Sequence, residues 1–266
     1  AAMADGSKTS DVIVEKSGTS GRIRLNRPAA LNSLSLDMVR AIVAATDEFE
    51  PAPDIATIVV TGEGDRAFCA GGDVRQIYES LDQGPELAQT FWREEYAFNA
   101  RIPELSTPYV AIMDGITMGG GVGIGQPATF RVATENTRFA MPETGIGLFP
   151  DVGGGWYLSH LQGRIGQFLA LTGARLDGAD CFEVGLATHY LPASTLAEAK
   201  AEIAEDPSRA DAILASYADA VPDARIAANL DKVDRLFASD RYEDILAALV
   251  ADGSDWAAKE LATLNA

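Results

Sequence analysis

The chain has 266 residues, of which 47% are hydrophobic and 23% charged, the composition of a folded globular protein rather than a disordered one. Asp and Glu number 39 against 21 Lys and Arg, which gives a formal net charge of −18 at pH 7. A field of that sign repels nucleic acid and anionic lipid, so we expect no nucleic-acid partner and no membrane partner. The apolar runs are interrupted by glycine or charge before they reach the length of a membrane span.

The two cysteines, Cys69 and Cys181, form no metal-binding or redox spacing, so we expect no bound metal and a reducing compartment. Residues 1–7 contain neither the basic segment nor the apolar segment of a signal peptide, and no transit peptide is visible. The expected location is cytoplasmic, or the mitochondrial matrix if the source is eukaryotic.

The N-terminal part of the chain predicts two short strands, 11–14 and 21–25, on either side of a turn rich in Ser and Gly. A helix is predicted to begin after Ser35, which suits the N-cap position, because apolar residues then recur along one face. The run of β-branched and apolar residues at 55–61 predicts the next strand.

Two more buried strands are expected at 109–113 and 129–133, each followed by a glycine-rich or polar turn. Strands separated by helical segments predict parallel β-α units and therefore an α/β fold. Residues 191–266 differ, because Ala, Glu, Asp and Leu dominate there and prolines interrupt helical patterns. We therefore predict a core over 11–190 and a helical C-terminal region over 191–266.

Several kinds of chemistry are disfavoured, because the chain has only two histidines, His160 and His189. The motifs G-x-G-x-x-G, G-x-S-x-G, H-E-x-x-H and G-x-x-x-x-G-K-[ST] are absent from the sequence. A dinucleotide cofactor is therefore not expected. We interpret His189 and Cys69 as structural residues.

Two glycine-rich segments, 66–75 and 114–123, are predicted to be turns between a strand and a helix. Small residues before a helix let backbone N–H groups approach a ligand closely. Two such turns that face one point could donate two hydrogen bonds to a developing oxyanion. Each segment taken alone is more often a plain connection.

Two further segments carry acidic residues in apolar surroundings. Glu143 and Asp151 lie in a stretch of Met, Ile, Leu and Phe punctuated by Gly and Pro, where a carboxyl group acquires a raised pKa. The alternative is that both residues cap helices or accept hydrogen bonds from backbone amides. Residues 91–96 form a charged stretch on an amphipathic helix, either a solvated face or a carboxylate turned into a cleft beside Trp92 and Tyr96.

Taken together, these segments resemble the crotonase (enoyl-CoA hydratase/isomerase) superfamily, and within it the branch of 3-hydroxyisobutyryl-CoA hydrolases. The resemblance covers about residues 11–190, and the order and spacing of its motifs are specific. The matching motifs are LNRP at 25–28, ALN at 30–32, AFCAGGD at 67–73, FWREEY at 91–96, GITMGGGVG at 115–123, FRVATE at 130–135, the run 141–155 and LALTG at 169–173.

The resemblance implies a spiral of β-β-α repeats that forms two roughly perpendicular sheets, followed by C-terminal helices. The region 191–266 is expected to be shorter than its counterpart in this branch. The implied ligand is an acyl-CoA, so CoA is part of the substrate and no separate cofactor is expected. A homo-oligomer, either a trimer or a hexamer, is also implied.

The resemblance also assigns site residues. The family's oxyanion hole maps onto the backbone N–H groups of Gly72 and Gly120. Its substrate-contacting glutamate maps onto Glu95, its catalytic glutamate onto Glu143 and its substrate-orienting aspartate onto Asp151. Substrate contacts are expected from Glu95, Gly120, Glu143 and Asp151, and contacts to the CoA moiety from Arg27, Arg66, Phe68 and Ala70.

Two positions distinguish the branches in this resemblance. Enoyl-CoA hydratases usually carry a second glutamate where this chain has Gly123, and glycine where it has Asp151. Hydrolysis is therefore expected, with Glu143 either attacking the thioester carbonyl or deprotonating a water, and with Asp151 accepting a hydrogen bond from a β-hydroxyl group. The expected substrate is 3-hydroxyisobutyryl-CoA, as in valine degradation. The alternatives are an isomerase or hydratase of the same superfamily, and an acyl-CoA-binding protein without activity.

Overall fold

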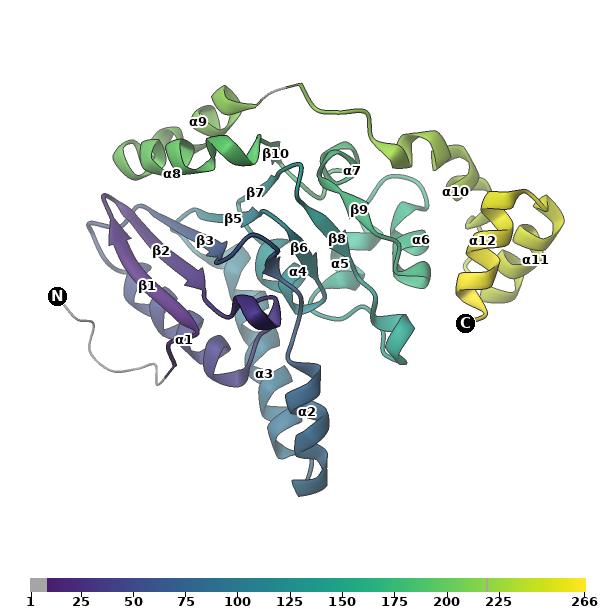
Figure 1. Cartoon of the computed structure of the whole chain (residues 1–266), viewed down its shortest axis with the longest axis horizontal. Coiled ribbons are helices and arrows are strands. Elements are labelled where there is room, and N and C mark those ends of the chain that lie inside the picture. The colour runs from purple at the N-terminus through teal and green to yellow at the C-terminus, as the bar shows by residue number, and fades with distance from the viewer. Residues whose placement is uncertain (1–8, 219) are drawn as a thin grey trace.

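The computed structural model describes residues 9–218 and 220–266, in which two sheets lie among helices (Figure 1). The first sheet has six strands, which are, in order across the sheet, β1 (Val12–Ser17), β2 (Ser20–Leu25), β3 (Thr57–Gly62), β5 (Tyr109–Met113), β7 (Phe130–Ala133) and β10 (His189–Tyr190). The second sheet has four strands, β4 (Ala67–Cys69), β6 (Ile116–Met118), β8 (Arg138–Ala140) and β9 (Leu176–Asp177).

The helices are α1 (Leu36–Phe49), α2 (Val74–Ser80), α3 (Glu86–Arg101), α4 (Gly120–Gly125), α5 (Gly154–Ser159), α6 (Ile165–Thr172), α7 (Gly178–Glu183), α8 (Leu196–Glu205), α9 (Ala210–Tyr217), α10 (Leu230–Leu236), α11 (Tyr242–Asp252) and α12 (Asp255–Leu264). Among the described residues, none of these helices is both long enough and apolar enough to cross a membrane.

The chain places one strand in each sheet before it forms a helix, and it repeats this pattern. β3, β4 and α2 make the first repeat, β5, β6 and α4 the second, and β7 and β8 continue it. Within each sheet the strands of successive repeats pair in parallel. This arrangement confirms the predicted α/β spiral of β-β-α repeats.

Several predicted elements are confirmed. The strand at Tyr109–Met113 has the predicted bounds, and the helix α1 begins after Ser35, whose hydroxyl accepts a hydrogen bond from the Met38 backbone N–H at 3.1 Å. The first two strands are longer than predicted, so that only Gly18 and Thr19 remain between them.

The sequence did not predict the strands of the small sheet. The segments 66–75 and 114–123, predicted as turns that follow strands of the large sheet, each contain a strand of three residues, β4 and β6. Three residues are too few to show the alternation of apolar and polar side chains that marks a strand. Prediction from periodicity therefore merged each short strand with its neighbouring turn.

The helices after residue 191 pack in two places rather than forming one body. α8 and α9 cover a face of the large sheet, where Ile203 and Leu214 join a buried cluster with Val59, Val110 and Val132 (Figure 1). α10, α11 and α12 lie together at the other end of the molecule, where α10 and α12 pack against α6 and α11 packs on both of them (Figure 1). From residue 193 onward the described elements are all helical, as predicted, and the division of the chain at residue 190 stays a prediction.

Trp256 joins the last helix to the rest of the protein. Its ring stacks on Phe168 of α6, with 5.8 Å between ring centroids, and lies edge-on to Phe237 at 6.4 Å. We expect Trp256→Ala to lower the free energy of unfolding by about 3 kcal/mol, because a packed aromatic ring is lost. Trp156→Ala is the matched control, since that ring is 68% exposed, and it should change the free energy by less than about 1 kcal/mol. Equal effects in urea titrations would contradict this role of Trp256.

Candidate active site

Three neighbouring parallel strands of the small sheet end at one edge. β4 pairs with β6, and β6 pairs with β8, in parallel. The segment that follows β4 contains Gly72, the segment after β6 contains Gly120, and the segment after β8 contains Glu143. Because the carboxyl ends of parallel strands meet at one edge of a sheet, three groups that are distant in sequence come together there.

The two glycine segments approach each other closely. A methyl group placed on the Cα atom of Gly120 would lie 3.0 Å from the backbone nitrogen of Gly72. The segment before Gly72 is held in place by Leu34, whose N–H donates to the Gly71 carbonyl at 2.7 Å and whose carbonyl accepts from the Asp73 N–H at 2.7 Å. Among the described residues, neither the Gly72 N–H nor the Gly120 N–H has an acceptor. The pair therefore remains available to a ligand oxygen, as an oxyanion hole requires.

Two buried carboxyl groups face this pair of amides. Glu95 of α3 is only 3% exposed, and its Oε2 lies 3.0 Å from the methyl position on Gly120. Glu143 is 6% exposed, and its Oε1 lies 3.6 Å from a methyl group placed on Gly119. Glu95 Oε2 and both oxygens of Glu143 have no hydrogen-bond partner among the described residues. Unpartnered buried oxygens are rare in proteins and indicate a site that a ligand or water completes.

Burial makes both carboxyl groups weak acids. Desolvation, increased by the negative charge of Asp151, raises the pKa of Glu95 to about 8. Burial likewise raises the pKa of Glu143 to about 7, and Asp151 adds to that rise. Glu143, with a pKa near 7, is a stronger base than an exposed glutamate and is still ionised in a large fraction of the molecules at pH 7, whereas Glu95 is mostly neutral at that pH.

These groups line one cavity of about 140 Å³, called here the small cavity. It brings together most of the site residues predicted from the sequence: Ala70, Gly72, Glu95, Gly120, Glu143 and Asp151. The sequence predicted a raised pKa for Glu143 because its surroundings are apolar, and its burial in this cavity has that effect. The alternative role as a helix cap does not apply to its side-chain oxygens, which accept no backbone hydrogen bond among the described residues.

Three of the residues expected to bind CoA lie outside the small cavity. Arg27 is near it, because its guanidinium pairs with Asp73 at 2.8 Å. Arg66 is exposed and precedes β4, at the opposite end of that strand from the cavity. The side chain of Phe68 is fully buried in the core and does not line the cavity. A contact between CoA and these residues stays a prediction.

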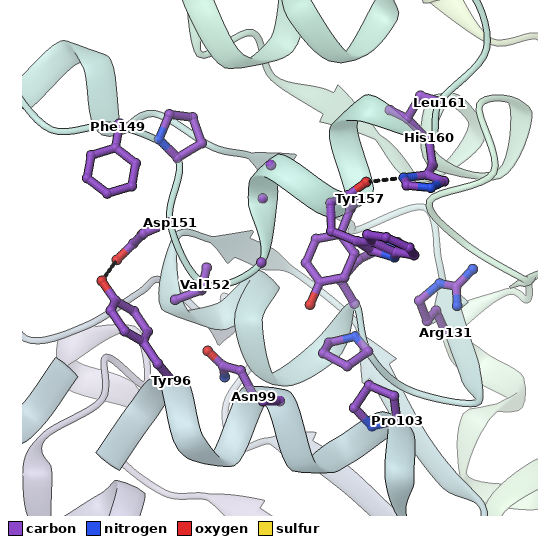
Figure 2. A pocket seen from close by; sticks show the side chains of 18 of the residues that line it. Tyr96, Asn99, Pro103, Arg131, Phe149, Asp151, Val152, Tyr157, His160 and Leu161 are labelled. Carbon is purple, nitrogen blue, oxygen red and sulfur yellow. Dashed lines mark hydrogen bonds between the residues drawn. The ribbon is translucent and has the colours of Figure 1, made fainter. Parts of the chain in front are cut away.

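Sequence reasoning missed the contact between Tyr96 and Asp151. The Tyr96 hydroxyl, on α3, donates a hydrogen bond to Oδ2 of Asp151 at 2.5 Å (Figure 2). Asp151 lies on the wall between the small cavity and a second one of about 1170 Å³, called here the large cavity. The signal in the sequence was the charged stretch 91–96, for which a carboxylate in a cleft was one of two alternatives.

Gly123 makes room for the residue that follows Asp151. A methyl group on Gly123 would lie 2.7 Å from Cβ of Val152 and 2.9 Å from Oδ1 of Asn99. Val152 has φ +48, a conformation that is strained for a β-branched side chain and persists only when its surroundings enforce it. Asn99 completes the contact by donating to the Gly123 carbonyl at 3.0 Å. A glutamate at position 123, the residue that the resemblance implies for hydratases, does not fit beside Val152 in this arrangement.

The two-sheet spiral and the paired free amides are features of acyl-CoA enzymes with the crotonase fold, and a model of the enoyl-CoA hydratase/isomerase family matches residues 20–266. The chain belongs to this family. It is 44% identical to the mitochondrial 3-hydroxyisobutyryl-CoA hydrolase of Rattus norvegicus, over 99% of this chain and 71% of that protein. The corresponding protein of Danio rerio is 46% identical, over 96% of this chain and 69% of that protein.

A solved structure shows the same fold. The crystal structure of a carnitinyl-CoA dehydratase from Mycobacterium thermoresistibile has a TM-score of 0.91 and 40% sequence identity, and the match covers 96% of this chain and 75% of that one. The superfamily and the branch inferred from the sequence motifs are therefore confirmed.

The raised pKa of Glu95 predicts a stability effect. Between pH 4.5 and about 8 this carboxyl group is ionised in the unfolded chain but neutral in the folded one, so the free energy of unfolding falls as the pH rises across that range and levels off above it. The glutamine in Glu95→Gln cannot ionise, so this variant avoids the fall in stability. Between pH 5 and pH 8, its free energy of unfolding relative to that of the wild type should rise by on the order of 2 kcal/mol, measured by urea titration.

Glu94→Gln is the control for this measurement. Glu94 precedes Glu95 in the chain, but its pKa is lowered by a hydrogen bond from Arg40. Its substitution should therefore lower the free energy of unfolding by a similar amount at both pH values. A difference between wild type and Glu95→Gln that is the same at pH 5 and pH 8 would show that Glu95 is not desolvated in the fold.

Gly123→Ala tests the contact with Val152. We expect it to lower the free energy of unfolding by about 1–3 kcal/mol, because the added methyl group overlaps Val152 in a packed region. Gly145→Ala is the control, since a methyl group there meets nothing within 4 Å. Thermal melts that place both variants at the same midpoint would refute the proposed packing.

Proposed function

We propose that this protein hydrolyses a short β-hydroxyacyl-CoA thioester, with 3-hydroxyisobutyryl-CoA as the preferred substrate, to the free acid and CoA. The observation that carries this proposal is the position of Glu143, a buried and unpartnered carboxyl group beside two free backbone amides. The curated relatives at 44–46% identity carry the name of this hydrolase and support the proposal.

The two amides act on the thioester carbonyl. Its oxygen is held by the N–H groups of Gly72 and Gly120, which stabilise the negative charge that develops when the carbonyl carbon is attacked. One such donor commonly lowers a barrier by about 3 kcal/mol. The glycine at each position leaves room for the thioester to approach the backbone.

Glu143 supplies the attacking group in one of two ways. In the first, its carboxylate attacks the carbonyl carbon, the C–S bond breaks, CoA leaves as a thiolate that takes up a proton, and water hydrolyses the acyl-glutamate anhydride. In the second, the carboxylate takes a proton from a water molecule, which attacks the same carbon, and the same C–S bond breaks. Both routes need Glu143 in its ionised form.

Asp151 contributes selectivity in this proposal. It lies on the wall of the small cavity and accepts a hydrogen bond from the β-hydroxyl group of the substrate. A site with a buried or half-buried acceptor rejects an analogue that lacks the matching donor, because the acceptor then stays unpaired. Glu95, neutral below its raised pKa, contacts the substrate from α3.

Hydration or dehydration is the second candidate, because a protein of known structure at 40% identity is named a carnitinyl-CoA dehydratase. Addition of water across a double bond uses two carboxylates that hold the water between them in the hydratases. Here position 123 carries no side chain, and Val152 and Asn99 occupy the space beside it. This arrangement favours hydrolysis over hydration.

The remaining parts of the proposal concern ligands and location. Acyl-CoA is the proposed partner and CoA enters as part of the substrate, with Arg27 and Ala70 nearest to the cavity among the residues proposed to bind it. A trimer or hexamer and a cytoplasmic location stay predictions.

Glu143→Gln tests the reaction. With 3-hydroxyisobutyryl-CoA as substrate, release of free thiol should fall by at least about a thousandfold, because the substitution removes the nucleophile or base and keeps the shape of the side chain. Binding of the CoA ester, measured by calorimetry, should persist. In the wild type, kcat/KM should rise with pH through about 7 and then level off, because the active form of Glu143 is ionised.

The exposed Glu183→Gln is the control and should keep the wild-type rate. A Glu143→Gln variant that still releases thiol at the wild-type rate would exclude Glu143 from the mechanism. A wild-type protein that hydrates or isomerises unsaturated acyl-CoA, and releases no thiol from the β-hydroxy ester, would replace hydrolysis by the second candidate.

A further inference from the structure

Asp151 needs a defined orientation if it is to recognise a hydroxyl group, and its own segment provides little support. The two residues after it, Val152 and Gly153, both have positive φ, at +48 and +86. The backbone therefore turns sharply beyond Asp151. Among the described residues, no side chain other than Tyr96 donates a hydrogen bond to this carboxylate.

The acidic groups beside Asp151 disfavour an ionised carboxylate that points into the small cavity. Glu95 and Glu143 line the same small cavity, and the pKa of each is raised by the charge of Asp151, which shows that the three acids repel one another when ionised. The large cavity on the other side of Asp151 offers a place into which a free carboxylate can rotate. Some contact must hold the carboxylate against this repulsion.

Tyr96 is placed to do so. Its hydroxyl lies 2.5 Å from Oδ2 of Asp151, and its side chain lines the large cavity but not the small one. The hydrogen bond thus reaches Asp151 from the side of the large cavity (Figure 2) and occupies one carboxylate oxygen. The other oxygen, Oδ1, has no protein partner among the described residues, and it is free to accept a hydrogen bond.

The chain itself keeps Tyr96 in position. Tyr96 follows Glu95 on α3, and Asn99 lies one turn further along the same helix, where it donates to the Gly123 carbonyl at 3.0 Å. One helix therefore supports Glu95, Tyr96 and Asn99 against the glycine segment and against the segment of Asp151. The helix fixes the backbone of Tyr96 relative to these segments, and the hydrogen bond to Asp151 places the phenol.

We propose that Tyr96 is a positioning residue that determines substrate selectivity: its hydrogen bond to Oδ2 of Asp151 orients the carboxylate so that Oδ1 receives the β-hydroxyl group of the acyl chain. The inference rests on the proposed thioester hydrolysis and assigns a residue that acts through Asp151 rather than on the reacting atoms.

The experiment compares Tyr96→Phe with wild type on two substrates, 3-hydroxyisobutyryl-CoA and isobutyryl-CoA, by thiol release. For the β-hydroxy ester, kcat/KM should fall about tenfold to a hundredfold, the usual effect of a lost hydrogen bond to a charged group. For isobutyryl-CoA, which has no hydroxyl, kcat/KM should change by less than about threefold. Tyr157→Phe removes a phenol hydroxyl from the same large cavity without touching Asp151, and it should leave both substrates unaffected.

A double-substitution cycle separates positioning from a general structural role. In the Asp151→Asn background the orientation no longer matters, so adding Tyr96→Phe should cause no further loss of selectivity. Equal losses on both substrates, independent effects in the cycle, or unchanged selectivity in Tyr96→Phe would each overturn the inference. A wild-type protein that releases no thiol from either ester would instead overturn the proposed function, so the two failures are distinguishable.

Discussion

The close approach of the segments after β4 and β6 is the constraint on which the rest of the site depends. A methyl group on Gly120 would lie 3.0 Å from the Gly72 nitrogen, and one on Gly121 would lie 2.0 Å from the Cys69 carbonyl oxygen. Only a chain without side chains at these points allows α4 to begin so near the end of β4. The two free amides are the direct product of this packing.

The same packing creates the electrostatic character of the site. α3 crosses the glycine segments and places Glu95 beside them, where it is removed from water, while the turn after β8 does the same for Glu143. Acidic groups in such surroundings destabilise the fold when they ionise, and this cost is what gives them a pKa near neutrality. The chain has a net charge of −18, and most of its acidic residues are exposed. The function proposed here uses two acids whose pKa is raised by burial, Glu95 and Glu143.

In the proposed function, the segment from Glu143 to Val152 and its contact with Gly123 favour hydrolysis over hydration. Space that a hydratase would use for a second carboxylate is taken here by Val152 and Asn99, and the strained backbone at Val152 follows directly on Asp151. Exchanging one carboxylate for another at a different place changes which part of the acyl group the enzyme can recognise. The fold alone does not decide this choice, and we propose that the packing around Gly123 contributes to it.

The amino-acid sequence by itself determined the α/β class, the strand at Tyr109–Met113, the N-cap at Ser35 and, through its glycine and acid motifs, most residues of the small cavity. These features depend on local pattern or on short motifs that can be read within one segment of the chain. Only the tertiary structure decided that three-residue strands form a second sheet, that Phe68 faces the core, and that Tyr96 binds Asp151 across 55 positions of the chain. Such contacts arise from the way distant segments pack, and periodicity within one segment carries no information about them.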